Sequence, residues 1–129
     1  MASYRKLHIS EVKDLAPDFG MSAMGEARFA RQALGAERIG MAHYTLKPDS
    51  SPGFGHRHGE SEEMYVVLRG SGRFKLGDEI VAVGPLDVVY CPPELMRAWQ
   101  AGPDGMEMLA FGAHTEGESS DMDQEFWSV

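Results

Sequence analysis

Short apolar segments separated by turn residues recur along the chain from residue 38 to residue 112. The segment 73–76 alternates between polar and apolar residues, and Gly77 and Asp78 join it to 79–83 as a predicted β-hairpin. Further strands are expected at 38–46, 62–68, 88–91, 97–101 and 106–112. Strands of about four to eight residues with turn signals roughly every eight to twelve residues are typical of an all-β sandwich or barrel. The pattern therefore predicts an all-β fold.

The segment that precedes these strands is less regular. Residues 1–37 form an expected N-terminal arm, in which Ser10 is placed to cap one helical turn before Pro17. The segment 27–34 accepts either a helix or a strand. We favour a strand there, because short segments and frequent glycines surround it.

The C-terminal tail, residues 113–129, is acidic and polar as far as Phe126 and Trp127. We expect it to pack these two aromatic side chains on the barrel or on a partner subunit. A frayed tail surrounded by solvent is the alternative.

Length and composition place the chain among single-domain globular proteins. Its 129 residues are enough to bury a core, and 43% hydrophobic and 25% charged residues are ordinary for a soluble protein. The formal net charge of −8 argues against binding to nucleic acid or to an anionic membrane. No apolar run approaches the ~20 residues needed to cross a bilayer, and no secretory signal is recognised. The single cysteine, Cys91, excludes an internal disulfide, and we predict a cytoplasmic protein.

Two histidines one residue apart, His56 and His58, lie on an extended, glycine-flanked segment. Residues i and i+2 of a strand point to the same face, so both imidazoles aim in one direction. Glu63 begins the next predicted strand. If the two strands are neighbours in a closed sheet, the three side chains converge, and two nitrogens with one carboxylate are ligands of a divalent metal. The alternative is that both histidines are barrel-mouth residues without a metal.

These residues resemble the first sequence motif of the cupin superfamily, in which two histidines one residue apart are followed by a glutamate and a glycine. The matching positions are His56, His58, Glu63 and Gly70. The family's second motif runs from a glycine to a fourth metal-binding histidine. In this chain we start that frame at Gly84 and follow it to Arg97, which stands where the histidine is usual. Glu94 stands where a glycine is usual.

The resemblance covers roughly residues 38–112 and implies a cupin-type double-stranded β-helix, which is a jelly-roll barrel with an interior site. We therefore expect one cupin domain over residues 1–129, with short N-terminal strands, a barrel core at about 38–112 and a C-terminal extension. The resemblance also implies a homodimer. It does not identify a reaction, because one fold hosts many chemistries.

Arg97 leaves two arrangements of the site open. A guanidinium is always charged and has no lone pair for a metal, so it cannot replace the missing histidine as a ligand. In one arrangement Arg97 pairs with Glu63, and the ion pair occupies the place of the metal. In the other, Arg97 reaches past the metal and binds an anionic group of the ligand.

Three further side chains complete the expected ligand-binding set: Tyr65, His43 and Trp99. Tyr65 is placed to donate a hydrogen bond into the cavity or to fill space, and Trp99 is placed to wall the pocket. His43 is weighed as a hydrogen-bonded barrel residue or as a substitute metal ligand. His114 is expected at the barrel rim.

Two functions fit these residues. The first is a barrel that binds a divalent metal (iron, manganese, nickel, cobalt or zinc) and a small, anionic organic ligand, with dioxygenase-like or isomerase-like activity. The second is a metal-free barrel that binds or senses a small molecule, in which Arg97 pairs with Glu63 and no catalysis occurs. A dimerising barrel with a vestigial cavity is a third interpretation. No nucleophile elbow, phosphate loop or dinucleotide fingerprint is present, and no catalytic residue is assigned.

Overall fold

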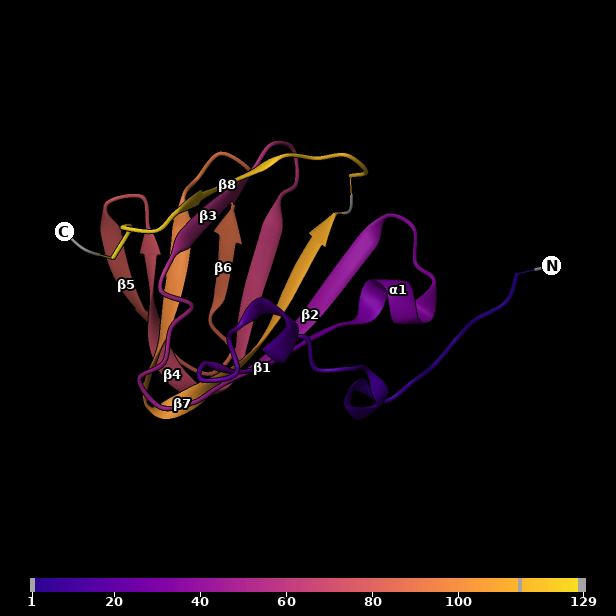
Figure 1. The fold of residues 1–129 in the computed structure, drawn as a ribbon, viewed down its shortest axis with the longest axis horizontal. Helices are drawn as coiled ribbons and strands as arrows, with labels where there is room; N and C mark the ends of the chain where they lie inside the picture. Colours follow the sequence, from indigo (N-terminus) through magenta and orange to yellow (C-terminus); the bar gives the residue numbers. More distant parts are fainter. Residues whose placement is uncertain (1, 114, 128–129) are drawn as a thin grey trace.

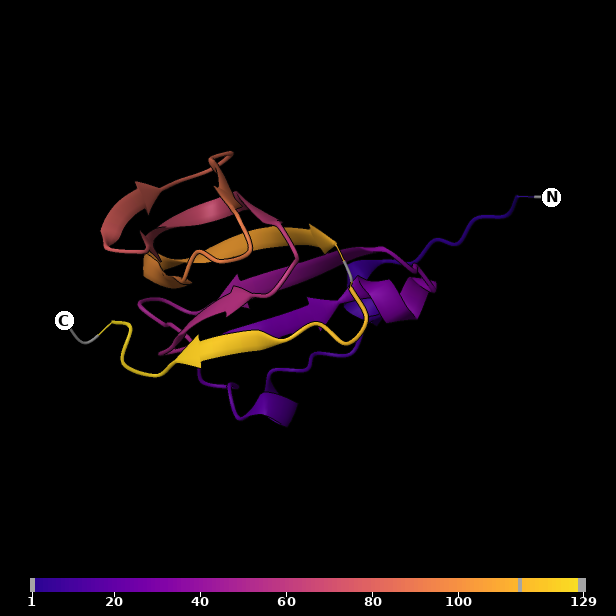
Figure 2. The same ribbon diagram turned by 90° about the horizontal axis from the view of Figure 1, so that it is seen from above.

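The computed structural model describes residues 2–113 and 115–127, and its strands form one curled antiparallel sheet with two facing layers (Figure 1, Figure 2). The strands are β1 (Gly25–Phe29), β2 (Ile39–Leu46), β3 (Gly55–His58), β4 (Glu63–Leu76), β5 (Glu79–Val83), β6 (Val88–Cys91), β7 (Arg97–Ala113) and β8 (Ser120–Asp123). Two 3-10 turns, Ile9–Glu11 and Pro17–Phe19, and the short helix α1 (Ala30–Leu34) lie in the N-terminal arm. The all-β prediction is confirmed.

Two long strands, β4 and β7, hold the sheet together. β7 pairs with β2, β3 and β4, and β4 also pairs with β5 and β6. β1 extends the sheet beyond β2, and β8 extends it beyond β3. Because β7 pairs with the strand that carries both histidines and with the strand that begins at Glu63, it sets the separation of the candidate metal ligands.

The prediction of strand ends at 69–72 and 102–105 is wrong, because β4 and β7 run through both segments. The register between the two strands instead shifts twice within 67–72. Gly70 has φ +75°, and a Cβ atom there would lie 2.1 Å from the carbonyl oxygen of Gly105. Glycine therefore lets the two paired strands bend together where turn residues predict a break.

The N-terminal arm contains both structures that the sequence leaves open at 27–34. β1 passes directly into α1, and Gly35, with φ +68°, ends the helix. The turn Ile9–Glu11 is capped by His8 rather than by Ser10, because the Nδ1 atom of His8 accepts a hydrogen bond from the Ser10 amide. Within the described residues, no helix has the length and apolar character needed to cross a membrane.

The C-terminal tail lies along the strand that carries the histidines. All four residues of β8 pair with β3, and Figure 1 shows the two strands side by side. Phe126 packs against Gly55, where a Cβ atom would lie 2.6 Å from the phenyl ring. The buried Lys75 donates a hydrogen bond to the Phe126 carbonyl at 2.5 Å. This part of the tail is therefore packed on the barrel rather than frayed.

The core lies between the two layers of the sheet. Phe74, Met108 and Cys91 are completely buried. The rings of Tyr65 and Trp99 pack against Phe74, with centroid separations of 5.3 and 5.9 Å. Because Trp99 also borders the candidate site, the apolar core reaches directly to it.

The turn before β6 has a left-handed backbone at a leucine. Leu86 has φ +67° and is 77% exposed, and its amide donates a hydrogen bond to the Val67 carbonyl at 2.7 Å. Gly84, where the second motif is expected to start, has no positive φ. The expected start is therefore wrong: Leu86, which five residues separate from Pro92, holds the conformation that favours glycine.

We predict that Leu86→Gly is more stable than Leu86→Ala by about 1 kcal/mol, because alanine retains the left-handed strain and glycine does not. Both variants remove nearly the same exposed side chain, so the packing losses cancel in the comparison. Urea unfolding followed by circular dichroism measures the difference. Equal free energies of unfolding, or a more stable alanine variant, would contradict strain at this turn.

Candidate metal centre

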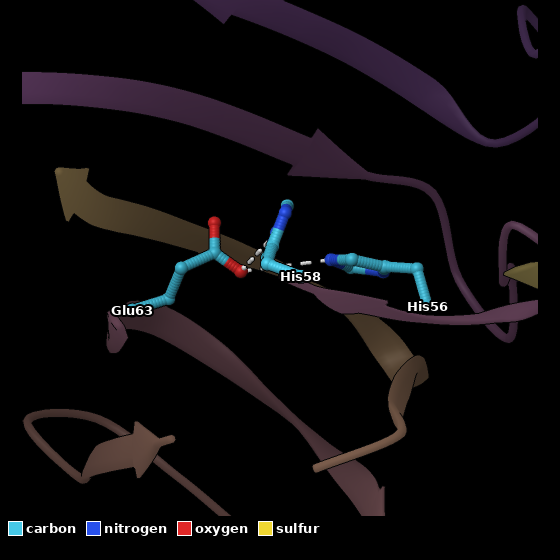
Figure 3. A group of neighbouring side chains, drawn as sticks. All are labelled: His56, His58 and Glu63. Carbon is cyan, nitrogen blue, oxygen red and sulfur yellow. Dashed lines mark hydrogen bonds and ion pairs between the residues drawn. The ribbon is translucent and has the colours of Figure 1, made fainter. Parts of the chain in front are cut away.

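His56, His58 and Glu63 meet inside the barrel. The two histidines alternate with Arg57 along β3, which turns both imidazoles to the same side of the strand. Glu63 opens β4, so the loop 59–62 brings its carboxylate back toward β3. Figure 3 shows both imidazoles pointing at the Glu63 carboxylate, and one ligand atom from each residue lies within 4.8 Å of the others.

The spacing of these atoms fits a metal ion. The Nε2 atom of His58 lies 3.1 Å from the Oε1 atom of Glu63, and the Nε2 atom of His56 lies 3.6 Å from the same oxygen. Ligand atoms bound to one ion at about 2.1 Å are themselves about 3.0 to 3.4 Å apart. All three side chains are partly buried, with 19 to 24% of each exposed. The donor types and the separations together mean that the group can hold a divalent metal.

Glu63 is held in its ionised form. The Tyr65 hydroxyl donates a hydrogen bond to its Oε1 atom at 2.6 Å, and Arg97 donates another from Nη2 at 2.8 Å. Burial by itself would raise the pKa of Glu63, but the contacts of His56, His58 and Tyr65 outweigh it and hold the pKa far below its ordinary value. The carboxylate is therefore available as a metal ligand at neutral pH.

Arg97 pairs with Glu63, which is the contact expected in the first of the two arrangements that the sequence leaves open. Its side chain is completely buried, and its Nη1 atom donates to the carbonyls of Leu95 at 2.7 Å and Pro93 at 3.2 Å. Its Nη2 atom binds Glu63, and its Nε atom contacts the Tyr65 hydroxyl at 3.4 Å. Every nitrogen of the guanidinium thus has a protein partner. The geometry gives no support to Arg97 as an anchor for an anionic ligand.

Glu118 is a site residue that the sequence does not single out. Its Oε1 atom lies 3.8 Å from the Nδ1 atom of His58, on the opposite side of the ring from Glu63. The Ser61 amide donates to Glu118 at 2.8 Å and the Glu60 amide at 3.0 Å, and the Ser61 hydroxyl contacts it as well. A carboxylate behind a histidine orients the ring toward a metal. In the sequence, Glu118 is one of several acidic residues of a polar tail, and no pattern distinguishes it.

His43 is not brought to the site. Its Nε2 atom lies 2.8 Å from a carboxylate oxygen of Glu107, whose other oxygen accepts from Arg69 at 2.9 Å. The hydrogen bond from His43 is the main reason that the pKa of Glu107 is lowered. Tyr44, the next residue of β2, faces the interior instead. The expectation that His43 binds ligand or metal is therefore not supported, and the expectation for His114 lies outside the described residues.

A cavity of about 450 Å³ adjoins the imidazoles. Its lining residues are Phe19, Met21, Met24, Ala27, Phe29, Tyr44, Pro52, Phe54, His56, His58, Trp99, Ser120 and Met122. Among the expected ligand-binding residues, Trp99 lines this cavity, whereas Tyr65 and Arg97 lie behind Glu63. A second cavity, of about 320 Å³, includes Glu63, Arg31 and Gln32 in its lining. Tyr44 and Phe29 border both cavities, so they separate them.

No protein-family model matches the sequence, and no curated protein matches it. Solved structures do. A cupin protein from Bacteroides fragilis has 18% sequence identity and a TM-score of 0.72, covering 91% of this chain and 89% of the other. A cupin-superfamily sugar phosphate isomerase from Silicibacter pomeroyi has 18% identity and a TM-score of 0.74, with coverages of 90% and 80%.

Oxalate decarboxylase from Bacillus subtilis is similar to this chain over a domain-sized portion of the enzyme. One structure has 25% identity and a TM-score of 0.76, and the match covers 94% of this chain. The chain spans about a third of the decarboxylase, because the match covers 32% of that protein. A further structure of the enzyme, at 24% identity, concerns its Mn(II) centres.

These matches agree with the curled antiparallel sheet. They confirm the predicted jelly-roll barrel, in which β4 and β7 carry the fold and β3 carries the histidines. The chain therefore has the cupin fold that these solved structures share.

Proposed function

We propose that this cupin binds a divalent transition metal through His56, His58 and Glu63 and acts on a small organic molecule held in the 450 Å³ cavity. The observation that carries the proposal is the convergence of both Nε2 atoms on one oxygen of Glu63. A metal with three protein ligands keeps open positions, and there it acts as a Lewis acid toward a bound molecule. The histidines line the cavity, so those positions face the bound molecule.

Other residues of the chain prepare the three ligands. Tyr65 and Arg97 keep Glu63 ionised and fix its Oε1 atom from behind. Glu118 faces the Nδ1 atom of His58, which favours a proton on that nitrogen and a free lone pair on Nε2. The aromatic ring of Trp99 packs edge-on against His56, with centroids 5.6 Å apart, and limits its rotation. The ligand set is therefore held in place before the metal arrives.

Arg97 lowers the affinity of this centre for a metal and leaves one coordination position without a protein ligand. A cation and a divalent ion about 5 Å apart repel by several kcal/mol at an effective dielectric constant of about 20. The negative charge of Glu63, which lies between them, offsets part of this repulsion. Since Arg97 also takes the place of a fourth ligand, we propose that the metal is bound less tightly and keeps one more position for substrate than a four-ligand centre.

The ion pair between Arg97 and Glu63 favours a second candidate, a metal-free cupin that binds or senses a small molecule. At 2.8 Å the pair satisfies both charges without a metal. The hydrogen bond between His58 and Glu63 at 3.1 Å then takes the place of a metal–ligand bond. In this alternative the cavity remains, and no catalysis occurs.

We also propose that two copies associate through the outer face of β4, β6 and β7. Met64 is exposed there and pairs across the sheet with Tyr90 and Phe111, which are also exposed. An exposed apolar patch on one face of a small barrel suits a twofold interface. Light scattering should give twice the 14.2 kDa mass of one chain, and a monomer at high concentration would contradict the dimer.

The metal is tested by loading chelator-treated protein with Mn²⁺, Fe²⁺ or Zn²⁺ and measuring bound metal by elemental analysis. We expect about one ion per chain for the unchanged protein, and less than about 0.1 for His56→Ala and for Glu63→Gln. The matched control is His43→Ala, which removes a histidine that contacts Glu107 outside the site and should leave the metal content unchanged. Less than about 0.1 ion per chain in the unchanged protein would favour the metal-free candidate.

Arg97→His should raise metal affinity at least about tenfold, because it removes a repelling charge and adds a ligand. Arg97→Lys is the control: it keeps a positive charge and should give no increase. Without metal, Arg97→His should lose about 3 kcal/mol or more of stability, because the Glu63 charge loses its partner. Titration with a metal indicator and thermal unfolding measure the two effects. An unchanged affinity in Arg97→His would show that Arg97 does not limit metal binding.

A further inference from the structure

The cavity beside the histidines has the size of a small-molecule site and an apolar lining. Its volume of about 450 Å³ falls within the range of ligand pockets in proteins. No lysine, arginine, aspartate or glutamate is among its lining residues. Most of the wall consists of aromatic rings, methionines and one proline: Phe19, Met21, Met24, Phe29, Pro52, Phe54 and Met122. A molecule that fills this space must present an apolar surface over most of its body.

The polar groups of the lining are gathered around the imidazoles. The rings of His56 and His58 lie 5.2 Å apart, Trp99 lies 5.6 Å from His56, and Tyr44 lies 5.5 Å from Trp99. Within the described residues the indole Nε1 atom of Trp99 has no hydrogen-bond partner, but it is fully buried and so not open to the cavity. The Tyr44 hydroxyl makes no hydrogen bond within the described residues. The Tyr44 hydroxyl is therefore a donor beside the histidines that lacks an acceptor, and a ligand oxygen would supply one.

The cavity offers no fixed positive charge to an anion. Arg97, which the sequence suggests as an anchor, is completely buried, and all of its nitrogens have protein partners. Arg31 lines the other cavity, beyond the Tyr44 and Phe29 side chains. An ionised group placed among methionines and aromatic rings would lose its hydration without gaining a counter-ion. A metal at the histidines would supply positive charge to this cavity.

We propose that the ligand of this cavity is a ring-bearing, mainly apolar molecule with a single oxygen-containing head group at the histidine end, such as a phenol or a cyclic ketone. Compact, highly charged molecules such as dicarboxylates and sugar phosphates do not match the lining. The contact of the head group with a metal rests on the proposed function. The apolar body of the ligand is inferred independently of the proposed function, because the residues that line the cavity are the same without a metal.

The C-terminal tail provides a variant that alters the cavity without disturbing the core. Met122 lies on β8, lines the cavity and is 54% exposed. Met122→Glu places a carboxylate at the apolar wall, where the side chain can reach solvent in the absence of ligand. Ile80, on β5, is 53% exposed, so Ile80→Glu introduces the same charge at a similarly exposed apolar residue outside the cavity and outside the proposed dimer face.

The test is isothermal titration calorimetry of the full chain with 2-naphthol, 2-naphthoate and oxalate, first in chelator-treated protein and then with Mn²⁺. Without metal, 2-naphthol should bind at least about tenfold more tightly than 2-naphthoate or oxalate. Mn²⁺ should reduce the difference in binding affinity between 2-naphthol and 2-naphthoate. Met122→Glu should weaken 2-naphthol binding at least about tenfold, and Ile80→Glu should not change it.

Two outcomes would overturn the inference: oxalate binding as tightly as 2-naphthol in metal-free protein, or Met122→Glu binding 2-naphthol as tightly as the unchanged chain. Absence of 2-naphthol binding would overturn it as well. Failure of the metal proposal has a separate signature, because Mn²⁺ would then leave all three affinities unchanged while 2-naphthol still bound to metal-free protein.

Discussion

The Oε1 atom of Glu63 is the point on which the site depends. A hydroxyl, a guanidinium and two imidazoles all lie within 3.6 Å of this one oxygen. They come from β3, β4 and β7, so the geometry of the site is fixed by how these three strands pair. A carboxylate oxygen has two lone pairs and cannot serve all of its neighbours equally well. At this oxygen, a metal ion therefore competes with the protons of the groups that donate hydrogen bonds to it.

Arg97 and the histidines approach Glu63 from different sides of the fold. Arg97 begins β7 and is held by the carbonyls of the loop 92–95, whereas the histidines come from β3 and face the cavity. The ion pair therefore supports Glu63 from behind while the cavity side stays accessible to a metal and a ligand. In the proposed metal centre, Arg97 in place of the fourth histidine would lower the metal affinity and leave a further coordination position open, while the three other ligands remain together.

Part of this arrangement could be predicted from the sequence, because local patterns carry it. The alternation of His56 and His58 on a strand and the position of Glu63 at the start of the next strand are enough to predict their convergence. The pairing of Arg97 with Glu63 is one of two arrangements left open, because a sequence does not show which partner a long side chain takes. The strand ends predicted at 69–72 and 102–105 fail because glycines there serve bending rather than turning.

Other features of the site arise only from the tertiary structure. Glu118 reaches His58 because β8 pairs with β3, and no sequence pattern near either residue predicts that pairing. Met21 and Met24 line the cavity from a segment that looks irregular. His43 fails as a site residue because adjacent residues of a strand face opposite sides, and here Tyr44 takes the inner one. Which of two adjacent strand residues points to the interior depends on how the whole barrel packs.

The proposed function requires a metal ion among His56, His58 and Glu63. Anomalous X-ray diffraction from crystals of the chain grown with Mn²⁺ tests it most directly. We expect one anomalous peak about 2.1 Å from both Nε2 atoms and from the Glu63 carboxylate, with Arg97 still paired to that carboxylate. A map without a peak at these residues, while Arg97 and His58 both remain bonded to Glu63, would contradict it.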